Sequence, residues 1–220
     1  MVRSQLDDEL WFPDPHLGEP DGLIAVGGDL SVDRLLLAYS YGIFPWFSFR
    51  DCDEPYWYCP MQRFVIFPSE IHISHSMRTL MRKNLYRCTL NEDFKGVISH
   101  CSQLRYDEAG AWLGDDMIAA YTELHRQHLA TSVEVWERQA DGDDRLVGGL
   151  YGVSIGRCFF GESMFSLEPN ASKLALIYLS RFMSERGGLL IDCQLETPHL
   201  RSMGGRFIPY DDYLKIIHQE

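Results

Sequence analysis

Asp192 and Gln194 lie two residues apart in an otherwise apolar segment, LLIDCQL, at residues 189–195. Side chains of a β-strand alternate between its faces, so the pattern predicts that both project to the same side. A carboxylate in so apolar a strand is costly unless a cation or a hydrogen-bond donor meets it. The segment itself supplies no such partner. Asp192 is therefore either a structural residue that accepts backbone N–H bonds from a neighbouring loop or part of a reaction site.

Glu162 poses the same question in a second apolar segment, FFGESMF, at residues 159–165. Strand alternation predicts that it shares a face with Phe160 and Met164. Two strands that each place one carboxylate among apolar side chains are typical of a cleft that receives an amine beside an apolar group. The alternative is that Glu162 lies on a solvated face of the sheet.

Four cations, Arg78, Arg82, Lys83 and Arg87, occur between residues 78 and 87 without an acid. A helix that starts at Ser74 or Ser76 would place them in two parallel rows. The chain has 32 acidic and 20 basic side chains and a net charge of −12, so as a whole it repels a polyanion. This segment is the candidate for phosphate contacts, with a solvated helix face as the alternative.

An unusually aromatic segment, YGIFPWF, occupies residues 41–47. Such a segment either joins two parts of a protein or stacks on a base or a substrate ring.

Several classes of site and location are not supported by the sequence. It has no apolar stretch of membrane-spanning length and no apolar signal region, so we expect a cytoplasmic protein without membrane contact. Its six cysteines are scattered and predicted to be reduced. The two H-x-x-H pairs lack a carboxylate ligand motif, and no nucleotide-binding glycine motif is present. We therefore predict neither a metal nor a cofactor.

The elements that must position these residues divide the chain in two. Residues 1–60 are dense in Pro, Gly and aromatic residues, which predicts a small, loop-rich N-terminal domain with one short helix capped by Ser31. From residue 61 the chain predicts a strand, two helices, three strands, a long helix, a strand and a last short helix. This order favours an α+β fold with a mixed sheet over residues 61–220.

Taken together, these residues resemble the leucyl/phenylalanyl-tRNA–protein transferase family over almost the whole chain. The matching blocks are GLIAVGGDLS at 22–31, GIFPWFS at 42–48, SVEVW at 132–136, LVGGLYGVSIG at 146–156, FGESMFS at 160–166, NASK at 170–173 and LIDCQ at 190–194. The segment PHLRSMGGRFIP at 198–209 matches more loosely. The resemblance implies that the second domain has the GNAT-like fold, that of the acyl-CoA N-acyltransferases.

The resemblance also implies roles for individual residues. Asp192 and Gln194 would lie at the reacting ester, Glu162 at the α-amine of the aminoacyl group, and Trp46 near the terminal adenosine. Trp112 matches a further aromatic residue of the family. The family's side-chain pocket falls on five positions: Leu150, Met164, Leu176, Leu179 and Ile191.

The implied reaction moves Leu or Phe, with Met as a further candidate, from aminoacyl-tRNA to a protein that begins with Arg or Lys, which marks that protein for N-degron degradation. We interpret Asp192 as orienting the attacking amine and taking its proton, and Gln194 as holding the amine or donating to the oxyanion. A coenzyme A-dependent N-acetyltransferase of the same fold is the rival hypothesis, although the turn SLEPN at 166–170 lacks the glycines that bind pyrophosphate. A non-catalytic RNA- or peptide-binding module is the third.

Overall fold

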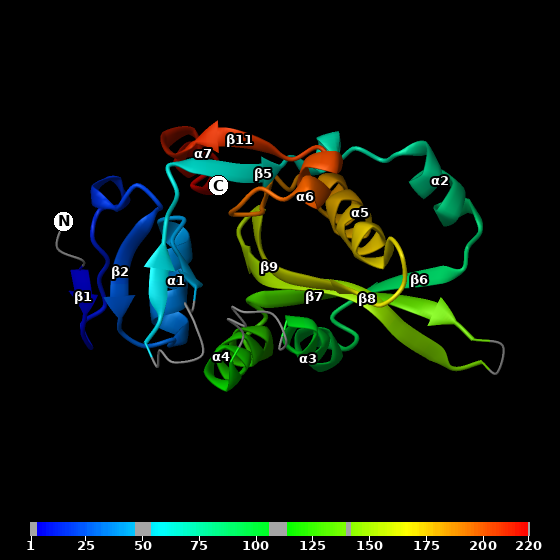
Figure 1. Ribbon diagram of the computed structural model, residues 1–220, viewed down its shortest axis with the longest axis horizontal. Helices are drawn as coiled ribbons and strands as arrows, with labels where there is room; N and C mark the ends of the chain where they lie inside the picture. The colour runs from blue at the N-terminus through cyan, green and yellow to red at the C-terminus, as the bar shows by residue number, and fades with distance from the viewer. Residues whose placement is uncertain (1–3, 47–53, 106–113, 140–141, 220) are drawn as a thin grey trace.

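The computed structural model describes residues 4–46, 54–105, 114–139 and 142–219, which form two β-sheets (Figure 1). A four-stranded sheet is built from residues up to Tyr58, and a seven-stranded sheet begins at Gln62. The predicted α+β class with a mixed sheet is confirmed. The division into two independent domains at residue 60 stays a prediction.

The smaller sheet has the strand order β1-β2-β4-β3. Its strands are β1 (Ser4–Leu6), β2 (Leu23–Gly27), β3 (Phe44–Trp46) and β4 (Tyr56–Tyr58), and helix α1 (Val32–Ser40) begins after the Ser31 cap. Trp57 is fully buried and donates its indole N–H to the Gly27 carbonyl oxygen at 2.9 Å. The sequence predicted none of these strands, because strands of three to five residues are too short to show an alternating pattern.

The larger sheet has the strand order β11-β5-β10-β9-β8-β7-β6. Its strands are β5 (Gln62–Ile66), β6 (Tyr86–Leu90), β7 (Ala130–Arg138), β8 (Asp144–Ile155), β9 (Cys158–Ser166), β10 (Leu190–Asp192) and β11 (Arg206–Pro209). Strands β6 to β9 form an antiparallel meander, and β10 pairs with β9 in parallel. A parallel neighbour requires a crossover connection, which the long helix α5 provides.

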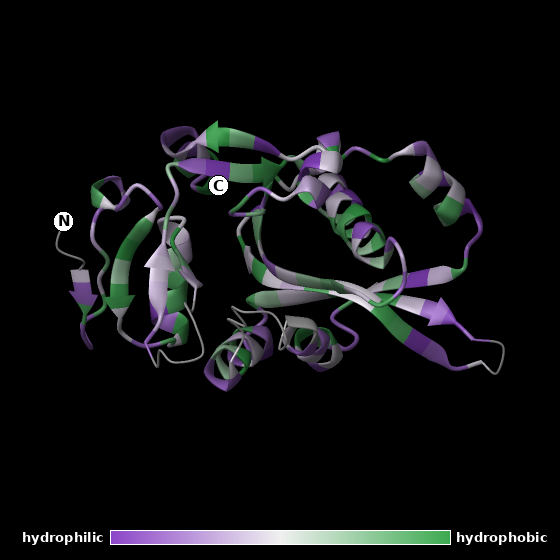
Figure 2. Cartoon of the chain, in the orientation of Figure 1, coloured by the Kyte–Doolittle hydropathy of each residue, from purple (hydrophilic) through white to green (hydrophobic). Residues whose placement is uncertain are grey.

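Helices cover both faces of this sheet (Figure 1). The helices that follow β5 are α2 (His75–Arg82), α3 (Phe94–Arg105), α4 (Asp115–Arg126), α5 (Ala171–Glu185), α6 (Pro198–Ser202) and α7 (Tyr210–Ile217). Two 3-10 turns, η1 (Pro15–Leu17) and η2 (Pro68–Glu70), occur elsewhere in the chain. Helices α3 and α4 contact one face, and α5, largely hydrophobic along its length (Figure 2), crosses the other. None of the helices in the described ranges has both the length and the apolar character needed to cross a bilayer.

Two predicted elements end earlier than the sequence indicated. Helix α2 stops at Arg82, Asn84 has a left-handed backbone with φ 51°, and the following residues form β6. Arg87 therefore lies on a strand and does not continue a helical row with Lys83. The strand expected over residues 189–195 ends at Asp192, and Gln194 is left-handed with φ 57°.

A β-bulge in β9 changes which side chains share a face. Tyr151 pairs with Ser163 while Gly152 pairs with Gly161, so Glu162 is the extra residue between them. A bulge shifts the alternation by one residue. Phe160 accordingly packs in the cluster on the α3 and α4 side, whereas Met164 packs against the cluster on the α5 side. The predicted common face of Phe160 and Met164 is wrong for this reason.

The C-terminal helix α7 links the two sheets. Tyr210 donates its hydroxyl to the Tyr41 carbonyl oxygen at 2.8 Å, and the His218 Nε2 lies 2.8 Å from the Ser40 carbonyl oxygen. Both acceptors belong to the end of α1 or the residue after it, so residues far apart in sequence fix the corner that leads into β3.

We predict that Gly42→Ala destabilises the protein more than Gly156→Ala. Both glycines have a left-handed backbone, with φ 69° and 57°, which costs a side-chain residue about 1–2 kcal/mol. A Cβ at residue 42 would also lie 2.4 Å from the Tyr213 ring, whereas nothing lies within 4 Å of one at residue 156. Overpacking adds about 1–3 kcal/mol. Urea denaturation measures both variants, and equal losses would mean that α7 does not fit tightly against this corner.

Candidate active site

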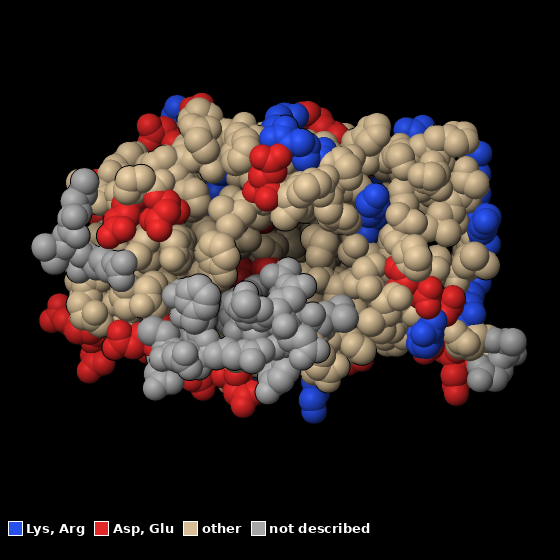
Figure 3. Space-filling view, viewed as in Figure 1, with Lys and Arg blue, Asp and Glu red and all other residues tan. Residues whose placement is uncertain are grey.

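A cavity of about 800 Å³ lies where β9 and β10 diverge. The two strands pair only along residues 158–160 of β9, although β9 continues to Ser166. Residues of β3, β4, α5 and the segment after β10 complete the walls. The space-filling view shows a hollow in the centre of this face, with acidic atoms visible inside it (Figure 3).

One wall of the cavity is apolar and contains four of the five residues predicted for the side-chain pocket. Leu150 and Met164 are cross-strand partners, and α5 and β10 add the others; the four are Leu150, Met164, Leu176 and Ile191. Leu179 does not line the cavity. It lies one helical turn beyond Leu176 in the same hydrophobic cluster, and its predicted role in the side-chain pocket stays a prediction.

The Glu162 carboxylate faces the cavity and is held by hydroxyl groups. Tyr39 of α1 and Tyr121 of α4 each donate to one of its oxygens at 2.7 Å, and the Gln194 Nε2 lies 3.3 Å from Oε1. Burial raises the pKa of the Glu162 carboxyl to about 7, although the two tyrosine hydroxyls act to lower it. No cation is bonded to it among the described residues. This arrangement suits the binding of an ammonium group.

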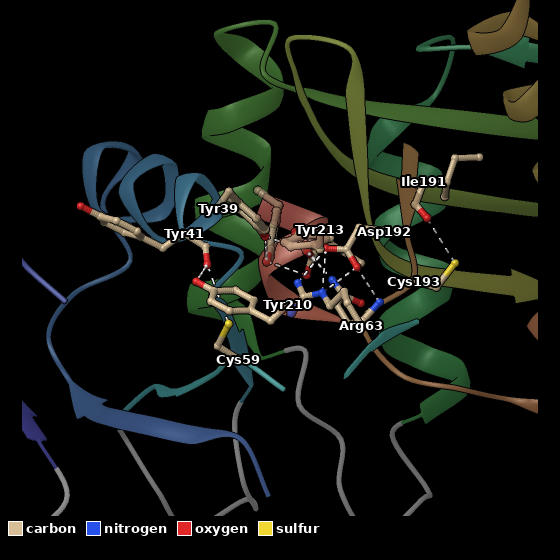
Figure 4. A network of polar contacts seen from close by, with 12 residues as sticks. Tyr39, Tyr41, Cys59, Arg63, Ile191, Asp192, Cys193, Tyr210 and Tyr213 are labelled. Atoms are coloured by element: carbon tan, nitrogen blue, oxygen red, sulfur yellow. Dashed lines mark hydrogen bonds and ion pairs between the residues drawn. The ribbon is translucent and has the colours of Figure 1, made fainter. Parts of the chain in front are cut away.

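Asp192 is in a different environment, a fully buried ion pair with Arg63 (Figure 4). Both Nε and a terminal nitrogen of Arg63 donate to the carboxylate at 2.6–3.0 Å, and the Tyr213 hydroxyl donates to Oδ2 at 2.8 Å. Burial alone would lower the pKa of the Arg63 guanidinium, but the adjacent Asp192 charge raises it above its ordinary value. The carboxylate thus has the cationic partner that the sequence could not identify.

The relation between Asp192 and Gln194 differs from the predicted one. Asp192 Oδ1 accepts the backbone N–H of Gln194 at 2.8 Å. Because the strand ends at Asp192, the two side chains do not share a face of one strand as predicted. Because both carboxylate oxygens are engaged and fully buried, Asp192 is not placed to take a proton from an amine in the cavity. Our interpretation of Asp192 as the proton acceptor is therefore revised. That Asp192 and Gln194 are needed for the reaction stays a prediction.

The two predicted tryptophans have different outcomes. Trp46, at the end of β3, lines the cavity with 38% of its surface exposed and makes an edge contact with Tyr58 at 5.4 Å between ring centroids. It thus both packs in the smaller sheet and presents a ring to the cavity. Trp112 lies outside the described residues.

Four polar residues of the site escaped the sequence analysis. Arg63 occurs in an apolar strand, and that position was the available signal. Tyr39, Tyr121 and Tyr213 lie on three different helices, where a tyrosine is compatible with an ordinary core. Only the tertiary structure brings their hydroxyls to the two carboxylates.

The candidate phosphate-binding residues divide between two elements. Arg78, Arg82 and Lys83 are exposed on or directly after α2, and basic side chains gather along the edge of the molecule formed by α2 and β6 (Figure 3). Arg87 instead bonds to Glu92 at 2.7 Å and Asp144 at 2.8 Å. Two carboxylates neutralise it in this structure, and its predicted role in phosphate contact stays a prediction.

The described part of the chain contains no group of three or more His, Cys, Asp or Glu side chains arranged to hold a metal ion.

Comparisons with known proteins assign the chain to a family. The model of the leucyl/phenylalanyl-tRNA protein transferase family matches residues 65–218, and that of its N-terminal domain matches residues 28–61. Among the curated relatives are leucyl/phenylalanyl-tRNA–protein transferases of Syntrophus aciditrophicus and Nitrosomonas eutropha. The first is 50% identical over 100% of this chain and 89% of the relative. The second is 46% identical over 99% and 90%.

A solved structure, that of L-PGS from Bacillus licheniformis, is similar to this chain with a TM-score of 0.44 and 9% identity, over 86% of this chain and 71% of the other.

We predict that Asp192→Ala lowers the free energy of unfolding by about 3–5 kcal/mol, because it leaves the Arg63 charge buried without a counterion. Asp29→Ala is the matched control. It also removes the partner of a buried arginine, Arg34, but Asp29 is half-exposed and Arg34 keeps two backbone carbonyl acceptors. Chemical denaturation of both variants tests this, and similar small losses would contradict a structural role for Asp192.

Proposed function

The chain belongs to the leucyl/phenylalanyl-tRNA–protein transferase family and is an aminoacyltransferase, and we propose that it moves Leu or Phe, and also Met, onto proteins that begin with Arg or Lys. One observation carries this proposal: a single cavity combines an apolar wall with a carboxylate, Glu162, that has no cationic partner among the described residues. An amino acid esterified to tRNA presents the complementary pair, an apolar side chain and an α-ammonium group.

The donor's aminoacyl group would occupy both parts of the cavity. Glu162 binds the α-ammonium group, while Met164 and the facing residues of α5 and β10 surround the side chain. Met164 is unbranched and adapts to an isobutyl, a benzyl or a thioether group. Such an apolar wall discriminates by about 1–3 kcal/mol per methylene, so it accepts this set of side chains and disfavours polar ones.

The reaction needs alignment more than activation, because the ester is already a reactive acyl donor. With Gln194 Nε2 turned to Glu162, the Gln194 side-chain oxygen accepts an N–H of the acceptor amine and orients its lone pair toward the ester carbon. The C–N bond forms, the bond from the carbon to the ribose oxygen breaks, and that oxygen receives the amine proton. An α-amine has a pKa of about 7.7–8.0, so a useful fraction is neutral near pH 7.

The tRNA would lie across two surfaces. Trp46 at the cavity rim stacks on the terminal adenine, a contact worth about 1–3 kcal/mol. Arg78, Arg82 and Lys83 contact backbone phosphates, which gives binding that weakens as salt is raised. This basic edge is needed because the protein has a net charge of −12.

The acceptor preference follows from charge. The protein has 32 acidic and 20 basic side chains and a net charge of −12. An N-terminal Arg or Lys is attracted to such an acidic protein, whereas an acidic N-terminal residue is repelled. The product would carry Leu or Phe at its N-terminus and enter an N-degron pathway in the cytoplasm.

The finer fold assignment belongs to the same proposal. An antiparallel meander followed by a crossover helix and a parallel strand that diverges from its neighbour supports the GNAT-like fold. The rival coenzyme A-dependent activity has weaker support, because the turn before α5 has Glu168 in place of pyrophosphate-binding glycines.

The proposed function predicts transfer of Leu, Phe and Met from the corresponding charged tRNAs to a peptide with N-terminal Arg, measured as the mass gain of one residue. The same peptide with an acetylated N-terminus is the control and should give no product. A peptide with N-terminal Glu should react much more slowly. Acetylation by acetyl-CoA without any aminoacyl transfer would contradict the proposal and support the rival activity.

We also predict that kcat/KM for charged tRNA, at saturating peptide, falls as the pH is lowered through about 7. Below that pH Glu162 is protonated before the donor binds and loses its attraction for the donor's ammonium group, because its pKa is raised to about 7. Glu162→Gln keeps the pH dependence that comes from the peptide's amine but lacks the fall that comes from Glu162. The difference between the pH profiles of wild type and variant therefore isolates Glu162. Parallel profiles would show that Glu162 does not bind the donor as an anion.

A further inference from the structure

We propose that Tyr213 and Arg63 are positioning residues for the transfer reaction: they hold Asp192, and Asp192 holds the turn that presents Gln194 to the cavity. The inference rests on the proposed function of the cavity. It adds the C-terminal helix to the parts of the protein on which the rate of transfer depends.

The Asp192 carboxylate accepts hydrogen bonds at both of its oxygens. Arg63 donates to both oxygens, Tyr213 donates to Oδ2, and the backbone N–H of Gln194 donates to Oδ1. All three side chains are fully buried, so water does not compete for these bonds. In a site shielded from water, removal of one donor leaves the carboxylate to rotate toward those that remain.

Gln194 connects Asp192 to the cavity. Gln194 has φ 57°, a left-handed conformation that a non-glycine residue adopts at a cost. Its backbone N–H bonds to Asp192 Oδ1, and its carbonyl oxygen accepts from the Phe64 N–H at 3.3 Å. The side-chain amide then lies 3.3 Å from Glu162. Asp192 therefore sets the direction of Gln194 through the main chain.

Tyr213 also contacts the chain that leads into the smaller sheet. Tyr213 lies on α7, and its ring meets the backbone at Gly42, at the corner between α1 and β3. The Arg63 guanidinium lies over the same ring at 5.0 Å from its centroid, and over the Phe44 ring at 4.8 Å. Figure 4 shows Tyr213 and Arg63 converging on Asp192 from two elements. Docking of α7 thus adds one of the hydrogen bonds that hold Asp192, and through it the Gln194 turn.

Tyr213→Phe tests the inference with little change of packing, since it removes one hydroxyl and retains the ring. We expect kcat to fall about tenfold, the order expected for a lost hydrogen bond to a charged group, with KM for charged tRNA unchanged. Tyr210→Phe is the matched control. It removes a hydroxyl from the same helix and a bond to the same corner, but one that has no contact with Asp192. We expect it to retain the wild-type kcat.

A double-mutant cycle with Gln194→Ala separates positioning from general stability. If Tyr213 acts through Gln194, the double variant is as slow as Gln194→Ala alone. If the two losses multiply, Tyr213 acts on the fold or by another route, and the inference is overturned. Equal kcat values for Tyr213→Phe and Tyr210→Phe would also overturn it.

Arg63→Lys provides a second readout on the other positioning residue. Lysine keeps the charge but not the planar pair of N–H donors that meets both Asp192 oxygens. We expect the same loss of kcat at unchanged KM, again absent in a Gln194→Ala background. Thermal unfolding shows that each variant is folded at the assay temperature.

The outcomes distinguish this inference from the proposed function. Wild-type protein that fails to transfer at all would refute the proposed function. Active wild-type protein, with losses that multiply in the double variants, would refute this inference alone.

Discussion

The buried ion pair between Arg63 and Asp192 constrains the structure more than any other interaction. Removing two charges from water costs several kcal/mol per ion, and an incompletely paired charge in this position is strongly destabilising. The pair is therefore stable only with β5 beside β10, with Tyr213 of α7 in place and with the Gln194 N–H directed inward. The sheet order, the C-terminal helix and the turn at the cavity all satisfy this one requirement.

Asp192 and Glu162 show how environment separates two carboxylates that look alike in sequence. Asp192 has a guanidinium, a hydroxyl and a backbone N–H, and water cannot reach it. Glu162 has neutral hydroxyl donors, no cationic partner among the described residues and a pKa raised to about 7. The first carboxylate is paired within the protein, and the second is left to pair with a ligand cation. The proposed structural and binding roles are divided accordingly.

The sequence predicted what depends on local patterns and long matching blocks. The meander, α5 and four pocket residues followed from apolar periodicity or from the family resemblance, and the comparisons confirm the family. The bulge at Glu162 and the left-handed Gln194 could not be predicted, because each is a backbone adjustment imposed by tertiary contacts. Arg63 and Tyr213 were missed for a related reason. Their partner lies more than a hundred residues from one and 21 from the other.

The bulge also explains why the two sheets must be held at a fixed separation. It turns Glu162 toward Tyr39 of α1 and Tyr121 of α4, while Met164 faces α5. In the proposed complex Glu162, on the larger sheet, binds the donor's ammonium group, and Tyr39 of α1 helps to hold that carboxylate. A shift of α1 relative to the larger sheet would move Tyr39 and disturb the alignment of the ester. On helix α7, the Tyr213 ring packs against the corner after α1 and its hydroxyl bonds to Asp192, so one residue joins this corner to the Gln194 turn.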